Sequence, residues 1–262
     1  MSDAILHESD GLTVVDVAAR SWETNSGIPG ARMKTLSRHV DGWTEVLLNW
    51  LPPDLGGGEP HRHFHRTVRE RGLVLGGELP MAEFVTGAPG PGAAVLFRTG
   101  FYMDRAPGCV HGLDPRETSQ SGFTILEWRD GPGTYLMEEA AAEESVVEQA
   151  PADVAALAPD RRAGVVIERA DLRLLDSLEL PWQPAVDEPY VRLQELTPGE
   201  VTIAYASPGS RVRLAGGSRG YVLAGSASLD AGVEVRVGCY LEHRGDAPLG
   251  TAGDVGCRVL RF

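Results

Sequence analysis

The sequence contains few cysteines and little positive charge. Its three cysteines, Cys109, Cys239 and Cys257, are an odd number and form no Cys-x-x-Cys pair, which argues against a disulfide framework and favours a reducing compartment. The formal net charge of -13 argues against a nucleic-acid partner and against an anionic membrane surface, because both need clustered Lys and Arg. We therefore expect a small-molecule substrate, with no nucleic acid and no membrane as partner.

The sequence also lacks long hydrophobic runs. No stretch approaches the roughly 20 apolar residues that a membrane-spanning helix needs. Residues 1–7 show no basic region followed by an apolar segment, which is the pattern of a secretory signal. These absences predict a cytoplasmic protein.

Glycine and proline, by contrast, are abundant. The 32 glycines and 18 prolines separate short apolar stretches, and this favours many strands joined by tight turns over long helices. The stretches that we expect to be strands are 44–51, 70–79, 94–97, 100–106 and 123–129. The pattern predicts an all-β fold.

The composition changes between residues 138 and 158, which are rich in alanine and glutamate. We interpret this stretch as part of a solvated acidic linker with one or two short helices. The chain is long enough for two domains. We therefore expect an N-terminal domain over 1–135, a linker over 136–164 and a C-terminal domain over 165–262.

The second half of the chain repeats the first. Two pairs of segments match: 73–77 with 221–225 at an offset of 148, and 100–104 with 238–242 at an offset of 138. Trp22 and Trp182 are expected to correspond as well. The matches keep the same order along the chain, which indicates an internal duplication.

Histidines and one glutamate recur at fixed spacings in the first half. Side chains alternate along a strand, so His61, His63 and His65 share one face. Glu70 begins the next expected strand, and His111 follows a Pro-Gly turn. Imidazole and carboxylate groups suit iron(II), manganese, nickel, copper or zinc. A polar surface hairpin is the alternative, but four residues at these spacings favour a metal site.

The stretch Gly57-x5-His63-x-His65-x4-Glu70-x6-Gly77 resembles the first motif of the cupin superfamily at every position. Gly100, the adjacent pair 107–108 and His111 resemble its second motif, although Pro and Gly adjoin and Pro115 stands where an Asn usually follows. The resemblance implies two tandem cupin barrels, each a double-stranded β-helix or jelly roll. It also implies that His63, His65, Glu70 and His111 hold one divalent metal ion per chain.

The duplication predicts that the second barrel has lost this metal site. The two offsets map His63 to Arg211, His65 to Arg213, Glu70 to Ser218 and His111 to Leu249. These residues are not a usual set of metal ligands. We expect Arg211 and Arg213 to face solvent, and the alternative is that they bind a carboxylate or phosphate of a ligand.

The segment 28–36 and the stretch 72–77 resemble cupins that cleave β-diketones and hydroxyacetophenones with oxygen. This resemblance implies a non-haem iron(II) dioxygenase acting on a small enolisable carbonyl compound, with zinc, nickel or manganese as alternative metals. Glu70 would be a fourth ligand or a base. His61 would be a catalytic residue of the pocket or would lie at the barrel mouth in solvent.

Two other functions fit the same residues. A metal-dependent isomerase or cyclase would use the metal to polarise a carbonyl while Glu70 or His61 moves a proton. The second alternative function is a non-catalytic zinc sensor, because the same segments also resemble the cupin domain of zinc-binding anti-sigma factors. The chain would act as a monomer whose two barrels form a pseudo-dimer, or as a homodimer.

Overall fold

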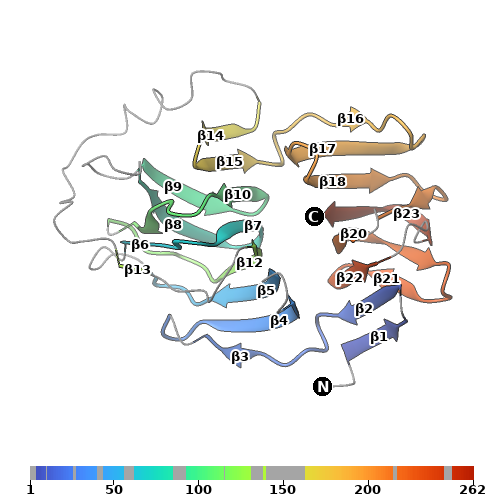
Figure 1. Cartoon of the computed structure of the whole chain (residues 1–262), viewed down its shortest axis with the longest axis horizontal. Helices are drawn as coiled ribbons and strands as arrows, with labels where there is room; N and C mark the ends of the chain where they lie inside the picture. Colours follow the sequence, from blue (N-terminus) through green and yellow to red (C-terminus); the bar gives the residue numbers. More distant parts are fainter. Residues whose placement is uncertain are drawn as a thin grey trace. The chain divides into compact units, whose positions relative to one another are not determined.

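The computed structural model is made of β-strands, and the part of the chain that it describes contains no α-helix (Figure 1). The described residues are 4–9, 11–25, 28–39, 44–55, 62–84, 93–114, 116–130, 138–139, 163–214, 217–244 and 250–262. Over these residues, no helix is long and apolar enough to span a membrane. The chain divides into two compact units. We call Trp22–Leu180 the N-terminal barrel, and Met1–Ser21 with Pro181–Phe262 the C-terminal barrel.

The N-terminal barrel contains two antiparallel sheets, of eight and five strands. The larger sheet has the order β14 (Val165–Arg169), β15 (Leu172–Asp176), β10 (Phe101–Arg105), β7 (Arg69–Gly76), β12 (Phe123–Asp130), β5 (Thr44–Leu51), β4 (Arg32–His39) and β3 (Glu23–Thr24). The smaller sheet has the order β13 (Glu138–Glu139), β6 (Arg62–Phe64), β11 (His111–Leu113), β8 (Glu78–Glu83) and β9 (Ala93–Arg98).

The two sheets of the N-terminal barrel enclose an apolar core. Val74, Met103 and Ile125 project into this core from β7, β10 and β12 of the larger sheet. Met81 and Phe97 project into it from β8 and β9 of the smaller sheet. Because successive side chains of a strand point to opposite faces, one face of each sheet supplies these residues, and the two facing sheets close around one core as a jelly roll. The expected all-β fold is confirmed.

The C-terminal barrel is built on one ten-stranded sheet. Its main path is β1 (Ile5–Glu8), β2 (Leu12–Asp16), β22 (Cys239–His243), β20 (Arg219–Leu229), β23 (Gly250–Arg261), β18 (Val201–Ala206), β17 (Val191–Thr197) and β16 (Gln183–Pro184). β19 (Arg211–Val212) pairs with β23, and β21 (Glu234–Arg236) pairs with β20. β20 shifts register against β23 after Val222 and after Gly225, and such bulges bend long strands.

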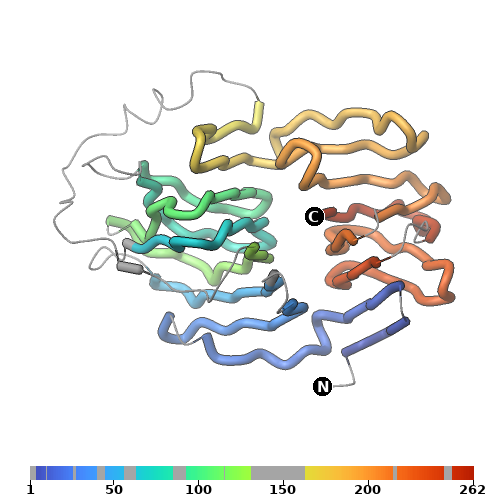
Figure 2. The backbone as a smooth tube through the Cα atoms, viewed as in Figure 1, coloured from blue at the N-terminus to red at the C-terminus, as the bar shows by residue number. Residues whose placement is uncertain are grey.

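Each barrel contains a strand pair from the other half of the sequence. The first hairpin, β1–β2, joins the C-terminal barrel because β2 pairs with β22. The hairpin β14–β15 joins the N-terminal barrel because β15 pairs with β10. Figure 2 shows both exchanges by colour, with blue beside red in one barrel and yellow beside green in the other.

The domain boundaries expected at residues 135 and 165 therefore differ from the units of the structure. The difference arises because each repeat begins with two strands whose hydrogen-bonding partners lie in the other repeat. The composition along the chain does not indicate which distant strands pair. The expected linker 136–164 lies outside the described residues except at 138–139 and 163–164.

The two barrels show the duplication in their backbone. Gly77 and Gly225 both have a positive φ, of 78° and 74°. A Cβ at Gly77 would lie 1.7 Å from the carbonyl oxygen of Gly122, and a Cβ at Gly225 would lie 2.0 Å from that of Gly256. Both positions thus need glycine for the same reason, which is a left-handed turn packed against a neighbouring strand. The two segments aligned at an offset of 148 are structural equivalents.

Candidate metal centre

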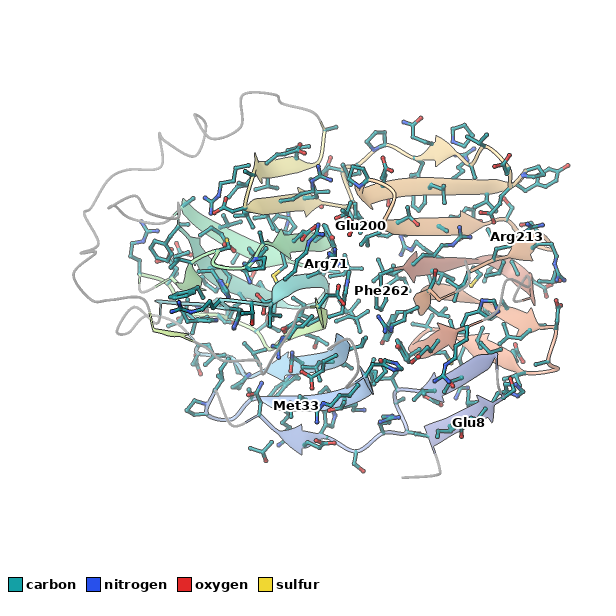
Figure 3. The ribbon with its side chains drawn as sticks, viewed as in Figure 1. Glu8, Met33, Arg71, Glu200, Arg213 and Phe262 are labelled. Carbon is teal, nitrogen blue, oxygen red and sulfur yellow. The ribbon has the colours of Figure 1, made fainter. Side chains whose placement is uncertain are left out.

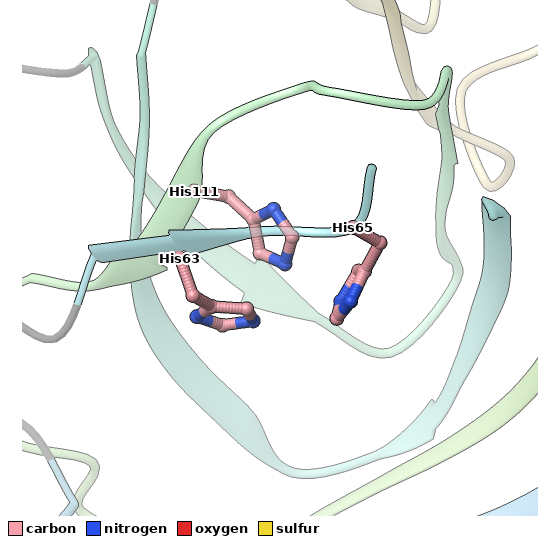
Figure 4. Close-up of side chains that lie close together, drawn as sticks. All are labelled: His63, His65 and His111. Atoms are coloured by element: carbon pink, nitrogen blue, oxygen red, sulfur yellow. The ribbon is translucent and has the colours of Figure 1, made fainter. Parts of the chain in front are cut away.

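Three histidines meet at the smaller sheet of the N-terminal barrel. His63 lies on β6, His65 follows that strand directly, and His111 begins β11, where it pairs with His63 across the strands. One ring nitrogen from each residue lies within 4.8 Å of the other two. His65 and His111 are buried, and His63 is half-buried. Figure 4 shows the three rings close together, with His63 and His65 on one segment and His111 on another.

The tautomer of His111 suits metal binding. Its Nδ1 lies 3.1 Å from the backbone carbonyl oxygen of Cys109, which can only accept a hydrogen bond. Nδ1 must therefore carry the proton and donate it, and Nε2 keeps its lone pair. Burial lowers the pKa of His111 well below its usual value, and the charge of Arg105 lowers it further. His111 is thus neutral and able to bind a metal ion.

The carboxylate of Glu70 lies beside the three rings. Its Oε2 is 3.4 Å from Nε2 of His111, and its Oε1 is 3.7 Å from Nε2 of His65. Two atoms that each lie about 2.1 Å from one metal ion are about 3.0 to 3.4 Å apart at octahedral or tetrahedral angles. Glu70 is therefore near the spacing of a fourth ligand, and the three histidines are the group whose ligand atoms all lie within 4.8 Å of one another.

Glu70 is the centre of a row of alternating charges that crosses five neighbouring strands. The strand registers place Arg38, Glu45, Arg129, Glu70 and Arg105 side by side on β4, β5, β12, β7 and β10. Nη1 of Arg105 donates to Oε2 of Glu70 at 2.8 Å, and Nε of Arg129 lies 4.0 Å from Oε1. Arg105 also pairs with Glu83 on the smaller sheet. We call these six residues the charged row.

The charged row sets the protonation of the buried carboxylates. Burial would raise the pKa of Glu70, but the adjacent His111 and the guanidinium of Arg105 hold it well below its usual value, so Glu70 is ionised. Burial raises the pKa of Glu127 to about 8, the charge of Arg129 opposes this shift, and the charge of Glu70 adds to it. Of the two carboxyl groups, Glu127 is thus the one that binds a proton more readily.

The donor set fits a divalent transition metal. Three imidazoles, of which His111 has a fixed tautomer, lie beside an ionised carboxylate, and this combination suits iron, manganese, nickel and zinc. Metal binding would also offset the desolvation of the Glu70 charge. His63, His65, Glu70 and His111, which the sequence predicts as one site, are brought together. His61 lies outside the described residues.

Sequence reasoning missed Arg105, Glu83 and Arg129. An arginine is usually expected at the surface. The side chain of Arg105, however, is only 4% exposed and lies between the carboxylates of Glu70 and Glu83. The available signal was the alternation along β10 and β12, which places Arg105 on the same face as the core residue Met103 and Arg129 on the same face as the core residue Ile125. Cys109 beside this site is buried, and burial raises the pKa of its thiol to about 12.

The C-terminal barrel has an apolar interior in place of this site. Arg211 and Arg213 are exposed, and Arg211 pairs with Asp230. Figure 3 labels Arg213 at the outer edge of this barrel. Their neighbours Val212 and Leu214 are buried in the apolar core of this barrel. The expectation that both arginines face solvent is confirmed.

Solved structures with the same fold span nearly the whole chain. The protein Ylba of Escherichia coli is 12% identical with a TM-score of 0.60, over 99% of this chain and 93% of that one. A suggested dioxygenase of Nostoc punctiforme is 15% identical with a TM-score of 0.63, over 96% and 81%. An oxalate decarboxylase variant of Bacillus subtilis is 12% identical with a TM-score of 0.56, over 97% and 77%.

These likenesses define the class of the fold. Identities this low show a shared fold and leave activity open. No protein-family model and no curated protein matches the sequence. The chain has the cupin fold, with two barrels in tandem and a three-histidine group in the N-terminal barrel that could hold a metal ion.

Proposed function

We propose that this protein is a metal-dependent enzyme in which His63, His65 and His111, together with Glu70, hold one divalent transition metal ion. The observation that carries the proposal is the convergence of three imidazole nitrogens within 4.8 Å beside a buried, ionised carboxylate. A surface cluster of histidines would not need a buried arginine such as Arg105 to hold its carboxylate in place. The site is built into the barrel, which argues for a dedicated role.

The reaction that we propose is oxygen-dependent cleavage of a small enolisable carbonyl compound. Iron(II) is the metal that suits this reaction, because it supplies the one-electron chemistry that oxygen needs to react with a closed-shell organic molecule. The dioxygenase suggested for the Nostoc neighbour is consistent with this choice. Glu70 either completes the ligand set or accepts the proton from the carbon next to the carbonyl, and Arg105 fixes its position.

The test is oxygen uptake by the purified protein on a panel of β-diketones and hydroxyaryl ketones, repeated without oxygen. Oxygen consumption matched to loss of the ketone supports the proposal. Glu70→Gln separates the two roles of Glu70. If Glu70 is a base, the variant should lose turnover and keep its metal content. If Glu70 is a ligand, the variant should lose both turnover and bound metal. Unchanged turnover in Glu70→Gln would contradict both roles.

A second candidate is an oxygen-independent metal enzyme, such as an isomerase or cyclase. The observation that favours it is the placement of Glu127 against Glu70, with Asn49 Nδ2 donating to Oε2 of Glu127 at 2.8 Å. Two adjacent carboxyl groups can pass a proton between them during such a reaction. Loss of the ketone under anaerobic conditions would select this candidate. Bound zinc with no turnover on the panel would instead favour a zinc sensor.

A further inference from the structure

The outer face of the C-terminal barrel carries a row of residues that lies across four strands. The registers place Arg192 beside Tyr205, Tyr205 beside Arg258, and Arg258 beside Ala224, on β17, β18, β23 and β20. Residues paired in this way project to the same face of a sheet. The row therefore holds two guanidinium groups on either side of one aromatic ring.

A pocket of about 290 Å³ lies over this row. Trp182 lines it together with all four members of the row, and the Trp182 ring packs edge-to-face on Tyr205 with 6.4 Å between centroids. Gly256 forms part of the lining, and a Cβ there would lie 2.9 Å from the Tyr205 ring. The volume is close to the lower limit of pockets that bind small ligands, about 300 Å³.

The two arginines of the pocket are not neutralised by the protein. Within the described residues, neither Arg192 nor Arg258 forms an ion pair, and the Nε of Arg258 is buried without a hydrogen-bond partner. The chain carries a net charge of -13, so carboxylates are abundant, yet the described residues that line the pocket include none. Arg258 is half-buried and Arg192 is exposed, so the cost of an unpaired guanidinium falls mainly on Arg258, and an anionic ligand would remove that cost.

The other barrel provides an internal comparison. The equivalent row is Arg32, Trp50, Thr124 and Gly76, which are paired in the same order on β4, β5, β12 and β7. There the guanidinium of Arg32 lies over the Trp50 ring at 5.7 Å, and threonine stands where the C-terminal barrel has Arg258. The fold thus does not require a second arginine at this position.

We propose that this pocket binds a small aromatic carboxylate. Arg258 and Arg192 bind the carboxylate from both sides of Tyr205, because a guanidinium matches a carboxylate with two parallel hydrogen bonds. Trp182 and Tyr205 pack on the flat ring. The small residues Ala224 and Gly256 leave room for that ring. The site needs no metal ion and is separate from the three-histidine site.

The test is calorimetric titration of the full-length protein with benzoate. We expect saturable one-to-one binding with a dissociation constant below about 1 mM. Arg258→Thr, which installs the residue of the other barrel, should weaken binding at least about tenfold, or about 1.4 kcal/mol. Arg213→Thr removes the same charge from an exposed position of the same barrel and should leave binding unchanged. His111→Ala should also leave it unchanged, which excludes binding at the metal.

Comparison ligands test the aromatic part of the proposal. Cyclohexanecarboxylate has the same charge without a flat ring and should bind several-fold more weakly than benzoate. Trp182→Leu should weaken benzoate binding and reduce the difference in affinity between benzoate and cyclohexanecarboxylate. Arg192→Gln is a second variant if Arg258→Thr does not fold, as judged by thermal unfolding. Absence of saturable benzoate binding, equal binding in Arg258→Thr, or equally tight binding of inorganic phosphate would each overturn the proposal.

Discussion

Arg105 is the residue that connects the metal site to the rest of the N-terminal barrel. Its guanidinium donates to Glu70 at 2.8 Å and also pairs with Glu83, whose side chain is fully buried. Burial raises the pKa of Glu83, although Arg105 opposes the shift. Two buried carboxylates thus share one cation, and removing that cation leaves each without its nearest counter-charge.

Arg105→Met keeps most of the side-chain volume and removes the charge. We expect the free energy of unfolding to fall by about 3 to 5 kcal/mol, because a broken buried ion pair leaves an uncompensated charge. Arg173→Met is the matched control on the adjacent strand β15, where the pair with Glu168 is partly exposed and should contribute less than about 1 kcal/mol. Urea unfolding in the presence of a chelator measures the free energy of unfolding of both variants. Equal losses in the two variants would contradict this role of Arg105.

At the scale of single elements, the strands that carry local patterns could be predicted from the sequence. The expected strands 44–51 and 123–129 closely match β5 and β12, and the histidine spacing correctly grouped His63, His65 and His111. These features depend on alternation and turn residues within a few positions. The charged row depends on registers between strands up to 84 residues apart, from Glu45 to Arg129, and single-sequence patterns do not encode such registers.

The face of β19 explains why the second barrel cannot regain a metal site by simple substitution. Val212 and Leu214 point into the core, so the positions aligned with the two histidines point outward. The double variant Arg211→His with Arg213→His should therefore bind no additional metal. Elemental analysis checks this, with the wild-type protein as reference. A rise of one metal ion per chain would show that these positions face the barrel interior.

At the scale of the whole molecule, the exchange of hairpins ties each barrel to the other half of the sequence. Residues 12–16 pair with residues 239–243, and residues 172–176 pair with residues 101–105. The sequence predicts two repeats, but it also predicts that each repeat forms its own unit. Only the strand pairing shows that neither repeat alone contains all the strands of one barrel.

Deletion of residues 1–21 removes β1 and β2 and should destabilise the C-terminal barrel. The strand β22 would lose the partner that it pairs with along its whole length, so its amides should exchange with solvent faster. The strand β10 is the matched reference, because its partners β7 and β15 remain in the deletion variant. Hydrogen exchange with mass spectrometry measures both strands. Unchanged protection of β22 would contradict the strand exchange.

The most direct test of the central claim is the metal content of protein purified anaerobically without an affinity tag. We expect about one transition metal ion per wild-type chain. In His63→Ala and His111→Ala it should fall below about a tenth of that, because losing a ligand weakens metal binding strongly. His7→Ala removes a histidine of the C-terminal barrel and should retain full occupancy. A wild-type protein without metal, or full occupancy in both ligand variants, would contradict the metal site.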